Sequence, residues 1–260
     1  MRKIICALAV MLLLPAFSLK AGKIITDSVQ SQILGSEVKY NVYLPDGFDK
    51  SEKQYPVVYL LHGLYGTYQD WEQKGTMKEV ADELIRSGEA VEMVIVMPNA
   101  GDPDIHNVYN GYFNMPNWNY EDFFFKEFIP AVEKKYRGIG DKGHRAVMGL
   151  SMGGGGSTVY AQRHPDMFSS CYAMSAWLDQ QINPNTPEEK KDKFYYTCKA
   201  VREALPRQSP TLPRGLKGGN PLCVEIFLEK RSFPPECLSC FSTTSKVDPE
   251  NNGVHVSSQG

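Results

Sequence analysis

The chain has 260 residues and a formal net charge of −2 at pH 7, from 28 Lys and Arg against 30 Asp and Glu. This length suits one α/β domain with a substantial core. The nearly balanced charge provides no long-range attraction to nucleic acids or anionic membranes, so we expect neither as a partner.

The first 21 residues have the pattern of a secretory signal peptide. Arg2 and Lys3 form a charged start, residues 4–17 form an apolar run, and Ser18 or Ala21 marks a cleavage site. The run is short for a membrane span, and an uncleaved N-terminal anchor is the alternative interpretation. We therefore expect a secreted or periplasmic protein that has no stable membrane association after cleavage of the signal.

The cysteines do not indicate a metal site. Of the six cysteines, Cys6 lies in the leader, so an odd number remains and at least one thiol is unpaired. Cys237 and Cys240 form a single C-x-x-C, without a second pair or a nearby histidine at ligand spacing. We expect no bound metal.

Apolar patterning predicts strands and helices in alternation. Strands are expected at residues 23–34 and 37–44 as an edge hairpin, and at 55–61, 91–97, 144–149 and 168–176. Helices are expected at residues 76–85, 120–136 with a kink or a late first turn at Pro130, 156–164 and 186–205. This order indicates a doubly wound, mostly parallel sheet within residues 22–204, with its active site at the carboxyl ends of the strands.

A nucleophile elbow stands between the strand at 144–149 and the following helix. Gly149-Leu150-Ser151-Met152-Gly153 matches G-x-S-x-G, with an apolar strand before it and a helix after it. The two glycines remove side chains that would collide at so sharp a turn, which lets the Ser151 hydroxyl project from the sheet. The pattern predicts Ser151 as the nucleophile and the backbone N–H of Met152 as one oxyanion donor.

The strand at 55–61 ends in His62-Gly63-Leu64, at the same edge of the predicted sheet. The backbone N–H of Leu64 is the candidate for the second oxyanion donor. His62 is open to two interpretations, a general base or a residue that shapes the loop, and the second is favoured. The long segment 98–119 carries many aromatic residues, so we expect Tyr109 and Trp118, together with His62, to contact substrate.

The order of catalytic residues in this type of sheet is serine, then acid, then histidine. Of the histidines, only His255 lies late enough to be the base, and Asp248 is the only aspartate in the C-terminal tail that could be the acid. His255 stands in a polar context, however, and no aspartate in the tail follows a buried strand. The assignment of this pair is therefore weakly supported by the sequence.

Three motifs together carry a family resemblance: Leu61-His62-Gly63, Gly149-Leu150-Ser151-Met152-Gly153-Gly154 and His164-Pro165-Asp166-Met167-Phe168. Over residues 24–203 the chain resembles the esterase D group of the α/β-hydrolases. That group includes the feruloyl and acetyl-xylan esterases of carbohydrate esterase family 1, S-formylglutathione hydrolases and mycolyltransferases, and the exported feruloyl-esterase-like members are the most similar. The resemblance implies hydrolysis of esters through an acyl-serine, without a cofactor, on a small-molecule or carbohydrate ester.

Residues 205–260 depart from the family pattern. The family requires further strands bearing the acid and the base, whereas this tail is rich in proline and arginine and has one strand-like run, at 222–228. We hypothesise that a shift of reading frame at residues 203–205 replaced the ending, because local and global signals disagree only there. The alternative is a divergent tail in which Asp248 and His255 act.

Three functional hypotheses follow from the sequence. The first is an exported serine esterase that acts on acyl groups attached to carbohydrate. The second keeps the fold but transfers the acyl group to a sugar hydroxyl. The third is a degenerate hydrolase with little or no activity, because the acid and base strands are missing or irregular.

Overall fold

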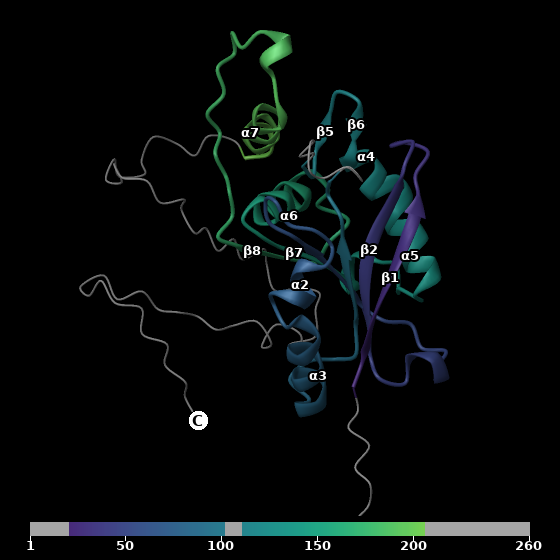
Figure 1. Cartoon of the computed structure of the whole chain (residues 1–260). Coiled ribbons are helices and arrows are strands. Elements are labelled where there is room, and N and C mark those ends of the chain that lie inside the picture. Colours follow the sequence, from purple (N-terminus) through teal and green to yellow (C-terminus); the bar gives the residue numbers. More distant parts are fainter. Residues whose placement is uncertain (1–20, 102–110, 206–260) are drawn as a thin grey trace, which may run out of the picture.

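The computed structural model describes residues 21–101 and 111–205, and a six-stranded sheet forms its centre (Figure 1). The strand order is β1-β2-β4-β3-β7-β8. β3, β4, β7 and β8 are parallel, whereas β1 and β2 add to the β4 side as an antiparallel hairpin. The strands are β1 (Lys23–Gln30), β2 (Glu37–Leu44), β3 (Val57–Leu61), β4 (Val94–Pro98), β7 (Arg145–Leu150) and β8 (Ser170–Met174). The predicted doubly wound α/β sheet is confirmed.

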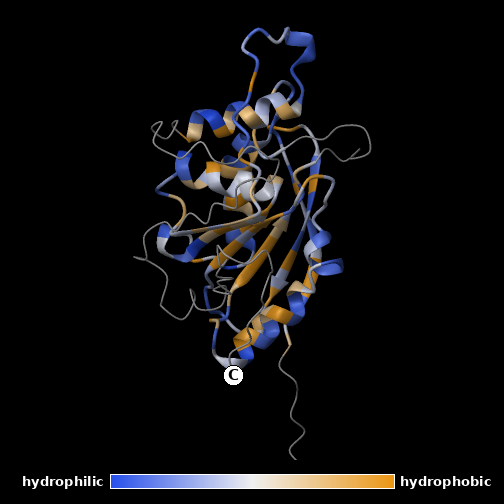
Figure 2. Ribbon diagram, turned by 90° about the vertical axis from the view of Figure 1, so that its left-hand side faces the viewer, coloured by the Kyte–Doolittle hydropathy of each residue, from blue (hydrophilic) through white to orange (hydrophobic). Residues whose placement is uncertain are grey.

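Helices cover both faces of the sheet. One hydrophobic cluster joins the sheet to α4, α5 and α6, and a second joins its other face to α3. The hydropathy colouring shows apolar residues following the central strands between these layers (Figure 2). The helices are α2 (Asp70–Gln73), α3 (Met77–Ser87), α4 (Tyr120–Phe123), α5 (Ile129–Lys135), α6 (Met152–Arg163) and α7 (Lys193–Ala204), with short 3-10 turns at Phe48–Lys50, Lys142–His144 and Glu188–Lys190.

The continuous apolar runs of the sequence are strands buried on both faces. All five residues of β3 are buried, as are those of β4. Tyr59 in β3 packs edge-on against Phe124, with ring centroids 5.4 Å apart. Such runs are typical of parallel strands enclosed between helical layers.

The predicted kink near Pro130 takes the form of a π-helical turn. α4 and α5 are joined by Phe124–Phe128, in which the N–H of Ile129 donates to the carbonyl of Phe124, five residues back. Proline lacks an N–H and its ring crowds the carbonyl four residues earlier, so a wider turn just before Pro130 relieves the conflict.

The largest differences from the predicted elements are at the starts of two helices and in the loop after β4. α6 begins at Met152 rather than at 156, because the glycines after the serine are helical despite their low propensity. α7 begins at Lys193 rather than at 186, where the Asp192 side chain caps it by accepting from the N–H of Tyr195. The predicted loop 98–119 contains a small hairpin of β5 (Asn114–Met115) and β6 (Trp118–Asn119).

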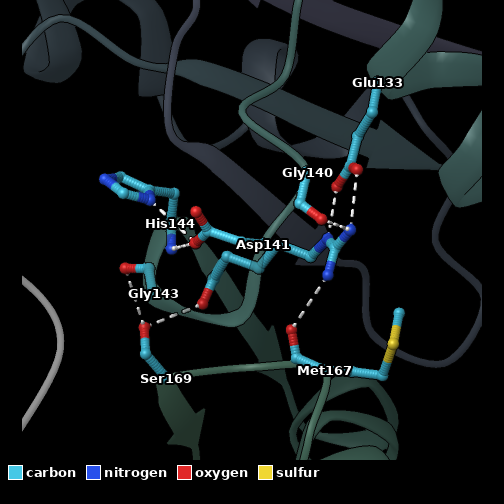
Figure 3. A network of polar contacts seen from close by, with 8 residues as sticks. Glu133, Gly140, Asp141, Gly143, His144, Met167 and Ser169 are labelled. Atoms are coloured by element: carbon cyan, nitrogen blue, oxygen red, sulfur yellow. Dashed lines mark hydrogen bonds and ion pairs between the residues drawn. The ribbon is translucent and has the colours of Figure 1, made fainter.

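A buried ion pair fixes the start of β7. The guanidinium of Arg145 donates to both carboxylate oxygens of Glu133 on α5, at 2.5 and 2.9 Å, and also to the carbonyl of Gly140. The hydroxyl of Tyr59 donates to the same carboxylate. In Figure 3 the carboxylate of Glu133 and the carbonyl of Gly140 point toward the same guanidinium group. Because each charge is paired, the strand that leads to Ser151 is held at its first residue.

Two cysteines lie in the described residues, and both are free thiols. Burial raises the pKa of Cys171 and of Cys198 to about 11, so neither thiol is ionised at neutral pH. Within the same residues, no three His, Cys, Asp or Glu side chains group closely enough to hold a metal ion.

Several predictions fall outside residues 21–101 and 111–205. These are the signal peptide, Tyr109, Asp248, His255 and the tail from residue 206. No helix between residues 21 and 205, apart from the undescribed 102–110, is long and apolar enough to cross a membrane.

Candidate active site

Ser151 occupies the turn between β7 and α6 and has φ 55° and ψ −111°. A positive φ is unfavourable for a serine and persists only where the surroundings impose it. Here the Ser151 N–H donates to the carbonyl of Met174 at 2.8 Å, and its carbonyl accepts from the N–H groups of Gly155 and Trp177, each at 2.9 Å. These bonds tie the strained residue to β8 and to the first turn of α6.

The two glycines of the elbow allow backbones to touch. A Cβ at Gly149 would overlap the carbonyl of Gly153, and a Cβ at Gly153 would overlap the carbonyl of Leu61 and lie 2.6 Å from that of His62. α6 therefore lies directly against the ends of β3 and β7. The steric reason expected from the sequence is present at both positions.

The loop after β3 passes beside the serine. A Cβ built on Gly63 would lie 3.8 Å from the Cβ of Ser151, and the N–H of Gly66 closes a turn on the carbonyl of Gly63 at 3.0 Å. Leu64 is the second residue of this turn. Met152 is the first residue of α6, where N–H groups have no partner within the helix, and its side chain is buried. Both backbone positions proposed for an oxyanion hole thus lie in segments that flank Ser151.

His62 is buried, with 3% of the residue exposed, rather than open at a substrate surface as the sequence predicts. Its Nε2 accepts from the N–H of Ala100 at 3.0 Å, which places the proton on Nδ1, 2.8 Å from the carbonyl of Gly63. Burial lowers the pKa of this imidazole and so favours its neutral form. His62 shapes the loop, as the second of the two interpretations held, and neither ring nitrogen is available as a base.

The two other histidines of the described residues also lie away from the serine. His144 precedes β7 at the opposite end of the sheet, where its Nδ1 lies 2.8 Å from Asp141 (Figure 3). His164 ends α6, and its ring stacks on Phe125 and reaches the carboxylate of Glu121 at 3.0 Å. Neither can act as the base for Ser151.

Trp118 belongs to the core rather than to a substrate surface, which corrects the expectation from sequence. Its side chain is 5% exposed and stacks on Tyr120, with ring centroids 6.4 Å apart. The β5–β6 hairpin turns the indole inward, because Met115 pairs with Trp118 across the two short strands. The aromatic residues of this segment that the structure describes fill the space beside α6.

Three residues beside the serine were not singled out from the sequence. Leu150 and Tyr65 are 42% and 66% exposed, and Trp177 bonds the serine carbonyl through its backbone and packs its ring against Phe194. Each directly follows or adjoins a recognised motif or strand end. In the sheet, β7 lies between β3 and β8, so the loops that follow these two strands flank the elbow.

Comparison with known proteins now identifies the family. Residues 31–212 match the Esterase family model ("Putative esterase"). The chain belongs to this Esterase family. The match fits the esterase D and carbohydrate esterase family 1 group of the α/β-hydrolases, which confirms the resemblance seen in the motifs.

The curated relatives match somewhat more than half of the chain. An endo-1,4-beta-xylanase/feruloyl esterase of Xylanibacter ruminicola is 31% identical over 166 residues, which are 62% of this chain and 22% of that protein. An esterase of Mycobacterium tuberculosis is 33% identical over 147 residues, which are 56% of this chain and 30% of that protein. The chain thus spans less than a third of the length of these curated relatives.

Solved structures show the same fold. A ferulic acid esterase is 49% identical with a TM-score of 0.63, and the match covers 71% of this chain and 69% of that one. A CE1 ferulic acid esterase from Anaeromyces mucronatus has a TM-score of 0.55 at 24% identity, over 65% of this chain and 64% of that one. The second likeness supports the α/β-hydrolase fold alone.

Proposed function

We propose that this protein is an exported serine esterase that hydrolyses acyl groups attached to carbohydrate through an acyl-Ser151 intermediate. The observation that carries the proposal is the backbone of Ser151, which stands at φ 55° between a buried strand and a glycine-rich helix. A serine held in this conformation at the carboxyl edge of a parallel sheet presents its hydroxyl to a bound ester. Family membership supports the same chemistry.

In the proposed reaction, Ser151 Oγ attacks the ester carbonyl and its proton passes to the departing alcohol. The ester C–O bond breaks and an Oγ–C bond forms, after which water releases the acid and restores the serine. The N–H groups of Leu64 and Met152 would bind the negative oxygen of each tetrahedral intermediate. A single such donor contributes roughly 10²–10³ in rate.

The names of similar proteins support a plant-cell-wall ester as the substrate class. A 49% identical structure is a ferulic acid esterase, and a curated relative combines a xylanase with a feruloyl esterase. We propose hydroxycinnamoyl esters of carbohydrate as substrates, with water as the acceptor.

The test is covalent labelling followed by hydrolysis. A fluorophosphonate probe should label the protein once, and peptide mass mapping should place the label on Ser151. Ser151→Ala should abolish labelling and lower the release of ferulate from methyl ferulate below the wild-type rate, whereas Ser87→Ala, a surface control on α3, should keep both. Equal ferulate release by the wild type and Ser151→Ala would refute the proposal.

A further inference from the structure

A buried tyrosine connects the two segments that carry the candidate oxyanion donors. Leu64 belongs to the loop that begins with His62, and Met152 is the first residue of α6. Tyr112 lies in neither segment, is fully buried and donates its hydroxyl to the backbone carbonyl of His62 at 2.9 Å. Burial raises the pKa of this hydroxyl far above its usual range, so it remains a protonated donor at neutral pH.

The carbonyl that receives this bond lies where the loop touches α6. A Cβ built on Gly153 would lie 2.6 Å from the carbonyl oxygen of His62, so that oxygen lies against the residue that follows Met152. The hydroxyl of Tyr112 therefore holds the loop at its contact with the first turn of the helix.

The rest of Tyr112 is attached to the same helix. The hydroxyl of Tyr160 donates to the backbone carbonyl of Tyr112, and the two rings pack edge-on with centroids 6.4 Å apart. A Cβ built on Gly156 would lie 2.9 Å from Cδ2 of the Tyr112 ring. Because Gly156 and Tyr160 both belong to α6, Tyr112 is fixed to the helix by its backbone and ring, and to the loop by its hydroxyl.

The orientation of the Leu64 N–H follows from the bonds made by the preceding carbonyls. The carbonyl of Gly63 accepts from Nδ1–H of His62 at 2.8 Å and from the N–H of Gly66 at 3.0 Å. A trans peptide is planar and its N–H points opposite to its carbonyl, so fixing the Gly63 carbonyl also fixes the Leu64 N–H. The bond from Tyr112 fixes the peptide immediately before this one, and thus the starting direction of the whole turn.

We propose that Tyr112 is a positioning residue that holds the N–H groups of Leu64 and Met152 at the separation and direction needed to bind an oxyanion. The inference rests on the proposed function and adds the side chain that aligns the two donors. Donors that are already oriented stabilise the charge of the transition state, whereas the carbonyl oxygen of the bound ester carries little charge. Loss of the Tyr112 hydroxyl should therefore lower kcat rather than raise KM.

The test removes the hydroxyl and keeps the ring. With methyl ferulate, we expect Tyr112→Phe to lower kcat about tenfold, less than the roughly 10²–10³ lost with a whole donor, and to change KM less than about twofold. The rate constant for labelling of Ser151 by a fluorophosphonate should fall by a similar factor, because the phosphonyl oxygen would occupy the same hole.

Tyr43→Phe is the matched control. Tyr43 lies on β2, is 1% exposed and donates its hydroxyl to Asp82 at 2.8 Å, so this variant also loses a hydroxyl bond of a buried tyrosine. It should lower Tm but leave kcat and the labelling rate unchanged.

Hydrogen exchange tests the hold on the loop without relying on catalysis. The N–H of Gly66 closes the turn on Gly63, so its exchange should become about tenfold faster in Tyr112→Phe and stay unchanged in Tyr43→Phe. A wild-type kcat or a wild-type rate of Gly66 exchange in Tyr112→Phe would overturn the proposal, as would an equal loss of kcat in both variants. A lack of labelling at Ser151 in the wild type would instead refute the proposed function, and the Gly66 exchange would still decide whether Tyr112 holds the loop.

Discussion

The imidazole of His62 joins the loop after β3 to the residues that follow β4. The ring Nε2 accepts from the N–H of Ala100, and the ring Nδ1–H donates to the carbonyl of Gly63. The backbone carbonyl of His62 accepts from the hydroxyl of Tyr112 at 2.9 Å. A histidine that is buried and bonded at both nitrogens fixes the path of the backbone. The position of the Leu64 N–H therefore depends on a side chain two residues earlier.

Replacing this ring should destabilise the protein in a pH-dependent way. His62→Leu leaves the buried N–H of Ala100 without its acceptor, which should cost about 1–3 kcal/mol at pH 8. Burial lowers the pKa of His62 in the folded state, so below the unfolded pKa of about 6.5 the unfolded chain binds a proton that the folded chain does not. The stabilisation by His62 is thus present above that pH and lost as the pH falls.

Urea unfolding at pH 8, 7, 6 and 5 measures this effect. The difference in free energy of unfolding between wild type and His62→Leu should shrink steadily toward pH 5. His144→Gln, at an exposed histidine paired with Asp141, is the control. A difference that stays constant with pH would contradict the assignment of a neutral, buried ring.

α6 combines poor helix propensity with close packing. Its first turn contains four consecutive glycines, Gly153 to Gly156, each of which costs about 1 kcal/mol relative to alanine in a helix. Added Cβ atoms would meet the backbone of Leu61 at the first position, the backbone of Ala176 at the second and the ring of Tyr112 at the fourth. The glycines lower the intrinsic stability of the helix, but they allow its start to pack directly against three neighbouring segments.

Gly153→Ala tests this account of the element. The added methyl group would overlap the carbonyls of Leu61 and His62, so we expect a loss of about 3 kcal/mol or more, at the upper end of overpacking. At Gly63 a Cβ would make ordinary contacts at 3.5 and 3.8 Å, and Gly63→Ala should change stability by less than about 1 kcal/mol. Thermal unfolding of both variants, followed by circular dichroism, makes the comparison; similar Tm values would show that α6 can move away from β3.

At the scale of the whole molecule, the described part of the chain holds a nucleophile and two candidate oxyanion donors but no histidine for the base. A separate apolar recess of about 150 Å³ lies between α3 and the sheet, and its lining, which includes Met77, Met148 and Tyr172, contains none of these catalytic candidates. The reading-frame hypothesis places the missing acid and base in another frame of the gene. The alternative places them at Asp248 and His255, outside the described residues.

The two accounts predict different rates. If the frame is shifted, His255→Gln should change kcat for methyl ferulate by less than twofold, and the wild type should retain only about 10³–10⁴ over the uncatalysed rate. Restoring the frame at residues 203–205 should then raise kcat by about 10²–10⁴, the contribution of a positioned general base. We expect this result. A large loss of kcat in His255→Gln alone would instead assign the base to the tail.

Local patterns were sufficient for the elements and for the serine. The apolar runs gave β3, β4 and β8 to within a few residues, and G-x-S-x-G located both the end of β7 and the start of a helix. The inward position of Trp118 and the burial of His62 could not be predicted in this way. The burial of His62 depends on a hydrogen bond from Ala100, in a distant segment, and that of Trp118 depends on the packing of its hairpin against the whole core, neither of which a short window contains.

The hydrogen bonds of Ser151 link the nucleophile to the outermost strand of the described sheet. The N–H of Ser151 donates to the carbonyl of Met174 in β8, and the carbonyl of Ser151 accepts from the N–H of Trp177, just beyond that strand. β8 has β7 on one side and no strand partner on the other within residues 21–101 and 111–205. An opening of this edge, which would cost less than global unfolding, would release the serine amide to solvent exchange. The reactive residue thus shares the hydrogen-exchange behaviour of an edge strand, although it stands at the end of a central one.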